Sequence, residues 1–210
     1  ESLLKKRFEI TVDRESMPIR EELNALRSFY AEQKKVLYIN KNLSKAQEKF
    51  LLGRELAFQV LQLSPRPYET ILQNPASFEV LLNNFKASYF ASALLMPEDM
   101  ITEDINRLVS SKKWEAKAWN SFVDKYDVTP EMLIQRLTNI LPGHFGIDQL
   151  FFLRMDTDIN TGVHEMTKEL HLSQLHNPHA NLLQEHYCRR WLAVSAMKEA
   201  HKQSKLKNSS

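Results

Sequence analysis

The stretch LLGRELAFQVL, residues 51–61, lies in a segment whose apolar residues recur at the spacing of an amphipathic helix. Upstream, Ser44 and Gln47 stand three residues apart and match a helix-capping box. Downstream, Pro65 marks the point before which the helix should end. The pattern therefore predicts a long helix whose core-facing side is made by Phe50, Leu51, Phe58 and Leu61.

The same stretch has the outline of a zinc-binding helix from which the ligands are missing. A His-Glu-x-x-His motif places two imidazoles one helical turn apart, facing one metal ion. At the corresponding positions this sequence has Arg54, Glu55, Leu56, Ala57 and Phe58. Of the three defining residues of the motif, only the glutamate is present. Neither the guanidinium at the first histidine position nor the phenyl ring at the second can bind a metal ion.

Length and composition favour a soluble globular protein of one or two domains. The 210 residues are 43% hydrophobic and 26% charged, and the net charge of +2 is too small to argue for nucleic-acid binding. Four glycines form no phosphate loop, and the single cysteine, Cys188, allows no intramolecular disulfide. We find no signal peptide and no apolar run of about 18 residues, so we expect a cytoplasmic protein without membrane contact. Because the chain begins at Glu1, we expect a fragment of a longer protein.

The remaining pattern predicts an α+β fold that is mostly helical. Strands are expected at residues 7–13 and 35–40, with a helix at residues 19–33 between them. A further helix is expected from a cap at Asn74 to a stop at Pro97. Three shorter helices should follow at residues 97–108, 113–125 and 129–139.

The pattern changes after LPG at residues 141–143, which is expected to break the last of these helices. Strands at residues 149–156 and 162–172 should form a hairpin, followed by a helix at residues 181–201. We therefore place a boundary between a mostly helical domain with a small sheet, residues 1–140, and a partial α/β sensor module, residues 141–210.

Several segments, taken in order, carry a family resemblance. LGRELAFQVL is followed by FKASYFASALLMPEDMI at residues 85–101 and by FVDKYDVTPEMLIQRL at residues 122–137. This succession resembles the ImmA/IrrE-type domain, a zincin-like metallopeptidase fold. FFLRMD at residues 151–156 and HYCRRW at residues 186–191 resemble the next module of the short-chain fatty acyl regulators, transcription factors of the XRE class. The resemblance covers roughly residues 5–200.

The resemblance implies a regulator with a DNA-binding helix-turn-helix, a peptidase-like middle domain and a C-terminal sensor. No helix-turn-helix is evident in residues 1–40, so DNA contact is expected only through an N-terminal part missing here. We expect a homodimer in which a short-chain acyl-CoA or related metabolite favours one arrangement of the two chains. A dimerisation scaffold without a small ligand is one alternative.

The resemblance also places a third zinc ligand, a glutamate, at the position of Asn84. Together with Arg54 and Phe58, all three expected ligand positions lack a metal-binding group, so we expect a degenerate site with no metal, no cofactor and no enzyme activity. Glu55 would be the general base of an active relative. Without a metal-bound water we expect it to be a structural or solvated acid, paired with Arg54 or Lys49.

A second group of metal-capable residues lies near the C-terminal end. Its members are His171, His176, His179, His186 and Cys188. Their spacing matches no zinc pattern, so loop and helix-cap roles are favoured, and a metal-dependent hydrolase with an atypical site stays as a second alternative. One cysteine cannot supply the thiolates of the iron–sulfur cluster found in some regulators of this subgroup, and a buried apolar role is expected for it.

The resemblance implies an acyl-CoA pocket where the FFLRMD strand meets the HYCRRW helix. A short acyl chain binds mainly by apolar burial, so Phe152 and Trp191 should shield it. The phosphates of coenzyme A should meet cations, for which the candidates are Arg154, Lys168, Arg189 and Arg190.

Overall fold

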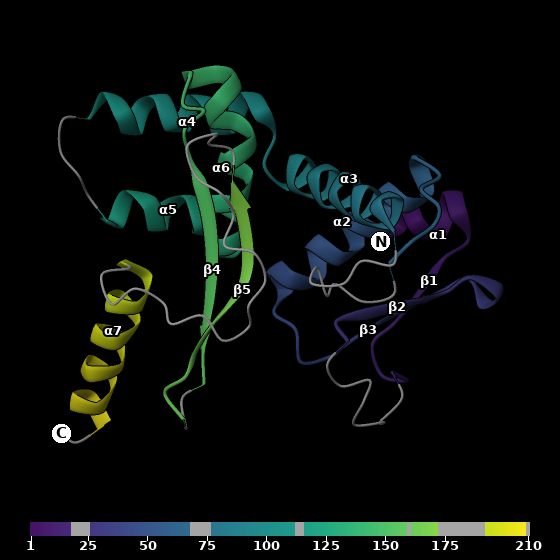
Figure 1. The fold of residues 1–210 in the computed structure, drawn as a ribbon. Helices are drawn as coiled ribbons and strands as arrows, with labels where there is room; N and C mark the ends of the chain where they lie inside the picture. The colour runs from purple at the N-terminus through teal and green to yellow at the C-terminus, as the bar shows by residue number, and fades with distance from the viewer. Residues whose placement is uncertain (18–25, 68–76, 112–115, 159–160, 172–191, 209–210) are drawn as a thin grey trace. The chain divides into compact units, whose positions relative to one another are not determined.

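The computed structural model describes residues 1–17, 26–67, 77–111, 116–158, 161–171 and 192–208. The chain divides into two compact units, Glu1–Ile140 and Leu141–Ser210. Seven helices and two small sheets in the described residues confirm the predicted α+β, mostly helical class (Figure 1). Within these residues, no helix combines the length and the apolarity that a membrane span requires.

The first unit begins with α1 (Ser2–Phe8) and a three-stranded sheet of β1 (Thr11–Asp13), β2 (Ser28–Ala31) and β3 (Val36–Ile39). The central strand β3 runs parallel to β1 and antiparallel to β2, to which it is joined through the short helix η2 (Glu32–Lys34). One core cluster connects this sheet with α1 and with α2 (Lys45–Val60). Its buried members are Leu4, Ile10, Leu37, Ile39 and Leu51.

Of the strand predicted at residues 7–13, only residues 11–13 are confirmed, by β1, and the α-helix predicted at residues 19–33 is wrong in its described part. Residues 7–10 are not a strand, because α1 continues to Phe8 and ends where Glu9 adopts a left-handed conformation with φ 61°. Residues 28–31 are not an α-helix, because they form β2 and pair with β3, from Ser28 opposite Ile39 to Ala31 opposite Val36, and the residues that follow form the 3-10 helix η2. Strand pairing is a tertiary contact, which overrides the local helical pattern. The predicted strand at residues 35–40 is confirmed by β3.

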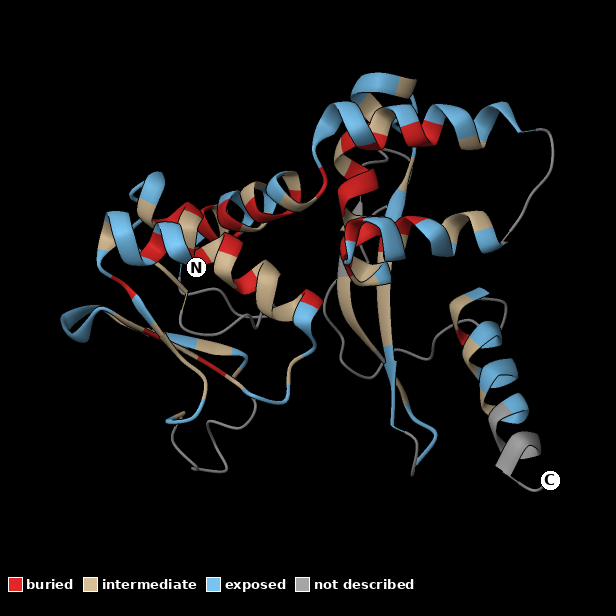
Figure 2. Ribbon diagram, turned by 180° about the vertical axis from the view of Figure 1, so that it is seen from behind, coloured by how far each residue is buried: buried red, intermediate tan, exposed pale blue. Residues whose placement is uncertain are grey.

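Helix α2 confirms the predicted helix and its capping box, in which Ser44 and Gln47 bond each other's backbone N–H groups. It packs closely on α3 (Phe78–Leu95), since a Cβ added at Gly53 would lie 3.1 Å from Ala91 Cβ. Both helices carry buried residues (Figure 2). Of the side chains expected to face the core, Leu51 and Phe58 are buried and Phe50 is partly buried, whereas Leu61 is exposed.

The ends of α3 agree only in part with the prediction. Ser77, and not Asn74, caps the helix, because its hydroxyl accepts a hydrogen bond from Val80 N. Asn74 itself lies outside the described residues. The predicted stop before Pro97 is confirmed, with Met96 at the C-terminal cap.

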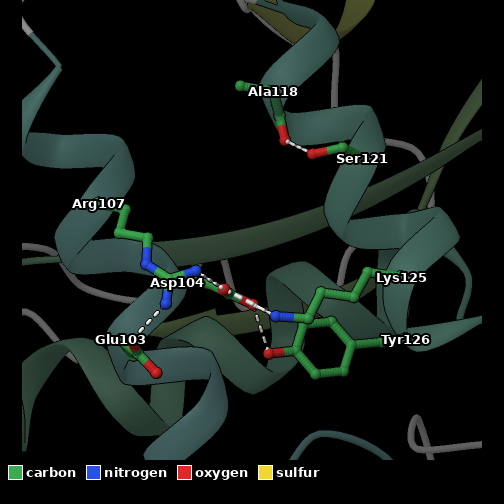
Figure 3. A network of polar contacts seen from close by, with 7 residues as sticks. All are labelled: Glu103, Asp104, Arg107, Ala118, Ser121, Lys125 and Tyr126. Carbon is green, nitrogen blue, oxygen red and sulfur yellow. Dashed lines mark hydrogen bonds and ion pairs between the residues drawn. The ribbon is translucent and has the colours of Figure 1, made fainter.

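Three helices follow, α4 (Glu98–Ser110), α5 (Ala116–Tyr126) and α6 (Pro130–Phe145), and the first unit ends within α6 at Ile140. Buried Asp104 on α4 joins the first two, because it accepts hydrogen bonds from Lys125 Nζ at 2.6 Å and Tyr126 Oη at 2.7 Å (Figure 3). Burial alone would raise the pKa of the Asp104 carboxyl, but the bonds from Lys125 and Tyr126 and the charges of Lys125 and Arg107 hold this pKa below its usual value.

The predicted break at residues 141–143 is wrong, since α6 continues through Pro142 to Phe145. A proline near the end of a helix removes only one backbone hydrogen bond, which the remaining turn tolerates here. The chain leaves the helix at Gly146, whose φ of 65° is the left-handed conformation that favours glycine after a helix.

The second unit contains the predicted hairpin, formed by β4 (Phe151–Thr157) and β5 (His164–His171) in antiparallel register. Helix α7 (Leu192–Asn208) contacts β4, with Val194 buried and Met197 Sδ 3.0 Å from Thr157 Oγ1. The described residues of α7 are mostly exposed (Figure 2). The predicted start of this helix at residue 181 lies outside the described residues.

Candidate functional site

The three positions expected to hold zinc ligands come together between α2 and α3. Arg54 Nη2 donates a hydrogen bond to Asn84 Oδ1 at 2.5 Å. Phe58, one helical turn after Arg54, has its ring centroid 6.0 Å from the Arg54 Cζ atom. The side chains at the three expected ligand positions therefore contact one another.

Glu55 lies buried beside these residues, with a relative exposure of 5%. Its Oε1 atom accepts hydrogen bonds from Gln59 Nε2 at 2.7 Å and from Arg66 Nη2 at 3.0 Å. The expected pairing with Arg54 or Lys49 is wrong, because Lys49 instead forms an ion pair with Asp127. Glu55 is thus a buried, paired acid and not a solvated one.

Arg66, which the sequence interpretation missed, is the centre of this arrangement. Its Cζ atom lies 4.4 Å from the Phe58 ring centroid and 4.6 Å from that of Tyr30 on β2, so the guanidinium contacts two aromatic rings. Both contacts are cation–π interactions, which add to the ion pair with Glu55. The available signal was the sequence Pro65-Arg66-Pro67 just after α2, since two prolines restrict the path of the loop.

Two pKa shifts report the electrostatics of this cluster. Removal from water lowers the pKa of Arg54 to about 10, and the positive charges of Arg27 and Arg66 act in the same direction while Glu55 opposes them. Burial, followed by the negative charge of Glu55, raises the pKa of Tyr30. The negative charge of Glu55 therefore does not fully balance the effect of burial and of the two neighbouring arginines on the Arg54 guanidinium.

The residues present do not fit a zinc ion. A catalytic zinc site needs three protein ligands drawn from imidazole, thiolate and carboxylate groups, with one open position. Here the three positions carry a guanidinium, a phenyl ring and an amide, and the amide oxygen of Asn84 already accepts a hydrogen bond from Arg54. A positively charged side chain, rather than an electron-pair donor, stands at the first of the expected ligand positions.

The residues expected to form an acyl-CoA pocket are only partly described. Phe152 on β4 is buried, and Lys168 Nζ lies 5.7 Å from its ring centroid. Arg154 pairs with Asp156 on the same strand, with 3.1 Å between Nη2 and Oδ2. The other three expected residues, Arg189, Arg190 and Trp191, lie outside the described residues.

The histidine group lies mostly beyond what the structure describes. His176, His179, His186 and Cys188 fall in residues 172–191, while the backbone of His171 ends β5 opposite Phe151. In the described ranges, no group of three or more His, Cys, Asp and Glu side chains is arranged to hold a metal ion.

The model of one protein family, the IrrE N-terminal-like domain or Peptidase_M78, matches residues 6–138. This chain belongs to the family of IrrE N-terminal-like domains. The match contains Arg54, Glu55, Phe58 and Asn84, so the substituted metal position lies inside an IrrE-like domain.

The fold of the IrrE-like chain is also similar to that of a Mycobacterium tuberculosis transcriptional regulator, with a TM-score of 0.61 and 20% sequence identity. The similar region covers 94% of this chain and 55% of that one, so the chain spans about half the length of the solved protein. Likeness at this identity shows the fold alone. No curated protein matches the chain.

Proposed function

We propose that this IrrE-like chain is a non-catalytic, regulatory part of a bacterial transcription regulator of the XRE class. The observation that carries the proposal is the hydrogen bond from Arg54 to Asn84, which joins two positions where a peptidase of this fold would bind zinc. Zinc-dependent hydrolysis needs a metal-bound water activated next to a general base. In this chain the candidate base, Glu55, is buried and bonded to Arg66 and Gln59.

A regulatory role is supported by the family and by the fold shared with a transcriptional regulator. In the proposed mechanism, an effector binds one arrangement of a homodimer better than another and so shifts their populations. DNA is bound by a helix-turn-helix outside this chain, and the change of arrangement alters the spacing of the two DNA-binding heads. Because bacterial DNA lies in the cytoplasm, the proposed role includes a cytoplasmic location.

The proposed effector is a short-chain acyl-CoA that binds the second unit. Support comes from buried Phe152 and the nearby Lys168 ammonium, which place an apolar surface and a cation side by side. Because Arg154 already pairs with Asp156, we assign the phosphate contacts first to Arg189 and Arg190. Trp191 would shield the acyl chain together with Phe152.

The non-catalytic part of the proposal is tested by metal analysis and a peptidase assay on protein purified without a polyhistidine tag. We expect no stoichiometric zinc and no cleavage of a denatured protein substrate. Zinc at about one ion per chain that disappears on His176→Ala or His179→Ala would instead support a hydrolase with an atypical site.

The effector is tested by calorimetry with propionyl-CoA and acetyl-CoA. We expect binding that is lost when Arg189, Arg190 and Trp191 are replaced by alanine together, and retained in an Arg107→Ala control, since Arg107 is an exposed residue of α4 in the first unit. Absence of binding at millimolar ligand would favour the dimerisation scaffold. Binding that survives the triple replacement would place the pocket elsewhere.

A further inference from the structure

The residues that replace the zinc site carry an excess of positive charge. We call Arg54, Glu55, Phe58, Arg66 and Asn84 the arginine cluster. It contains two guanidinium groups and one carboxylate, and that carboxylate is bonded to Arg66. Arg54 has only the neutral oxygen of Asn84 as its described hydrogen-bond acceptor. The position of a ligand carboxylate in an active relative is thus taken by a neutral amide.

Both guanidinium groups also retain hydrogen-bond donors that are not used. Arg54 Nε and Arg66 Nη1 are buried atoms for which the described residues supply no acceptor. An unsatisfied buried donor costs about 1–3 kcal/mol, and more where the group is charged. The cluster is not sealed, because Arg54 is half-buried and the side chain of Arg66 is 21% exposed. A group that arrives from solvent can therefore reach the exposed part of the cluster, but it meets the buried Arg54 Nε–H only after the side chains that cover this atom move.

We propose that the arginine cluster is an oxyanion-binding site that accepts a carboxylate or phosphate group at Arg54. The planar guanidinium group can donate two parallel hydrogen bonds to the oxygens of a carboxylate or phosphate. In Arg54 the Nε–H group has no hydrogen-bond acceptor among the described residues. A guanidinium cation stands where the family has a zinc ligand, so this part of the domain still attracts negative charge. Unlike a zinc ion, the guanidinium cannot accept an electron pair from the ligand. The anion would supply the counter-charge that Asn84 cannot.

Two aromatic side chains, Phe58 of the cluster and Tyr30 beside it, determine the shape of the site. Phe58 and Tyr30 hold the Arg66 guanidinium from two rings, and Phe58 also borders Arg54. Because Arg66 is fixed by these rings and by Glu55, it contributes fixed positive charge, while Arg54 is the group that binds the anion. This division of roles makes Arg54 the residue to test.

The test follows the Arg54 Nε–H signal in NMR spectra of the 15N-labelled 210-residue chain. Sodium acetate and sodium phosphate are titrated separately against sodium chloride at equal ionic strength, which separates a carboxylate from a phosphate preference. We expect a saturable shift of this signal with at least one of the two oxyanions and none with chloride. The Arg54→Lys variant, which keeps the charge but loses the planar fork, identifies the signal.

Affinity is then measured by calorimetry. We expect oxyanion binding about tenfold weaker in Arg54→Lys, as for the loss of a charge-assisted hydrogen bond. An Arg107→Lys control should bind as the unchanged chain does, because Arg107 is exposed and distant in sequence from the cluster. Equal affinity in Arg54→Lys would overturn the proposal. So would wild-type spectra in which no arginine Nε–H signal shifts with either oxyanion, a result that needs no variant.

The oxyanion site is independent of the proposed effector. If the chain binds acyl-CoA but the Arg54 Nε–H signal shifts with neither acetate nor phosphate, the oxyanion site is removed and the regulatory proposal stands. A saturable shift with acetate or phosphate in a chain that binds no acyl-CoA would establish the site and remove only the effector.

Discussion

Arg66 Nη2 lies 3.0 Å from Oε1 of buried Glu55, although the two residues are eleven positions apart and Arg66 follows the end of α2. The pair occupies the space beside the substituted metal position, where a metallopeptidase would keep its general base free. Because the side chain of Glu55 is only 6% exposed, removal of one partner leaves the other with an uncompensated charge.

The first prediction concerns the stability that this pair provides. Glu55→Gln should lower the free energy of unfolding by about 1–3 kcal/mol, the usual range for losing a charge-assisted hydrogen bond in a buried setting. Urea denaturation measures the change. The control is Glu103→Gln on α4, which removes an exposed ion pair with Arg107 and should cost about 0.5 kcal/mol or less. Equal losses in the two variants would show that the buried pair contributes no more than a surface one.

The contrast between Arg54 and Arg66 shows what the sequence could predict at this site. Arg54 and Phe58 share one face of a helix whose period is visible in the sequence, and the family resemblance supplied Asn84 as their neighbour. Arg66 reaches Glu55 only because the chain turns back after α2 and because Tyr30, far earlier in the sequence, provides a ring for it. Such a contact depends on tertiary packing, which no local spacing encodes.

The second prediction tests the close approach of α2 and α3. Gly53→Ala should destabilise the chain despite the better helix propensity of alanine, because the new Cβ would lie 3.1 Å from Ala91 Cβ and 3.3 Å from Ala91 Cα. Adding Ala91→Gly should recover part of the loss by removing the nearest atom. Thermal unfolding of the single and double variants gives the coupling.

Gly143 offers a matched control for that experiment, since it also lies in a helix and nothing stands within 4 Å of a Cβ added there. Gly143→Ala should stabilise the chain by about 0.5–1 kcal/mol. A Gly53→Ala variant that gains as much as Gly143→Ala would mean that the two helices can separate slightly without loss.

The third prediction follows from the lowered pKa of Asp104. A carboxyl whose pKa is lower in the folded chain stabilises it at pH values above its unfolded pKa of about 3.9. This contribution is lost as the pH falls through the lower, folded value. Stability measured by urea denaturation should therefore decline below about pH 4, and Asp104→Asn should show a shallower decline.

Tyr126→Phe separates the two kinds of interaction at Asp104. It removes the hydrogen bond from the Tyr126 hydroxyl but keeps the bonds from Lys125 Nζ, so the acid-dependent loss should lie between those of the unchanged chain and Asp104→Asn (Figure 3). A Tyr126→Phe profile identical to that of the unchanged chain would assign the whole effect to Lys125 and Arg107.

The well-predicted parts of the fold are those with short-range signals. The capping box at Ser44 and Gln47 and the hairpin of β4 and β5 each join residues that are near one another in the sequence, so local patterns are sufficient to predict them. The end of α6 was predicted wrongly, because the helix continues past Pro142 and ends before Gly146. The helix tolerates the proline in its last turn and ends at the glycine with positive φ. Which of the two residues ends the helix depends on the folded backbone, and the local sequence does not specify it.

The last prediction asks whether the metal-site geometry has survived the loss of its ligands. Restoring the expected set with Arg54→His, Phe58→His and Asn84→Glu places two imidazoles one turn apart on α2 and a carboxylate on α3, so the variant should bind about one zinc ion per chain. Metal analysis after dialysis measures this stoichiometry. The control carries Gln59→His in place of Phe58→His. It introduces the same two histidines and one glutamate but turns the second imidazole away from the first, so it should bind zinc weakly. A folded restored variant that binds no more zinc than this control would show that Arg54 and Asn84 approach each other in an arrangement a metal ion cannot use.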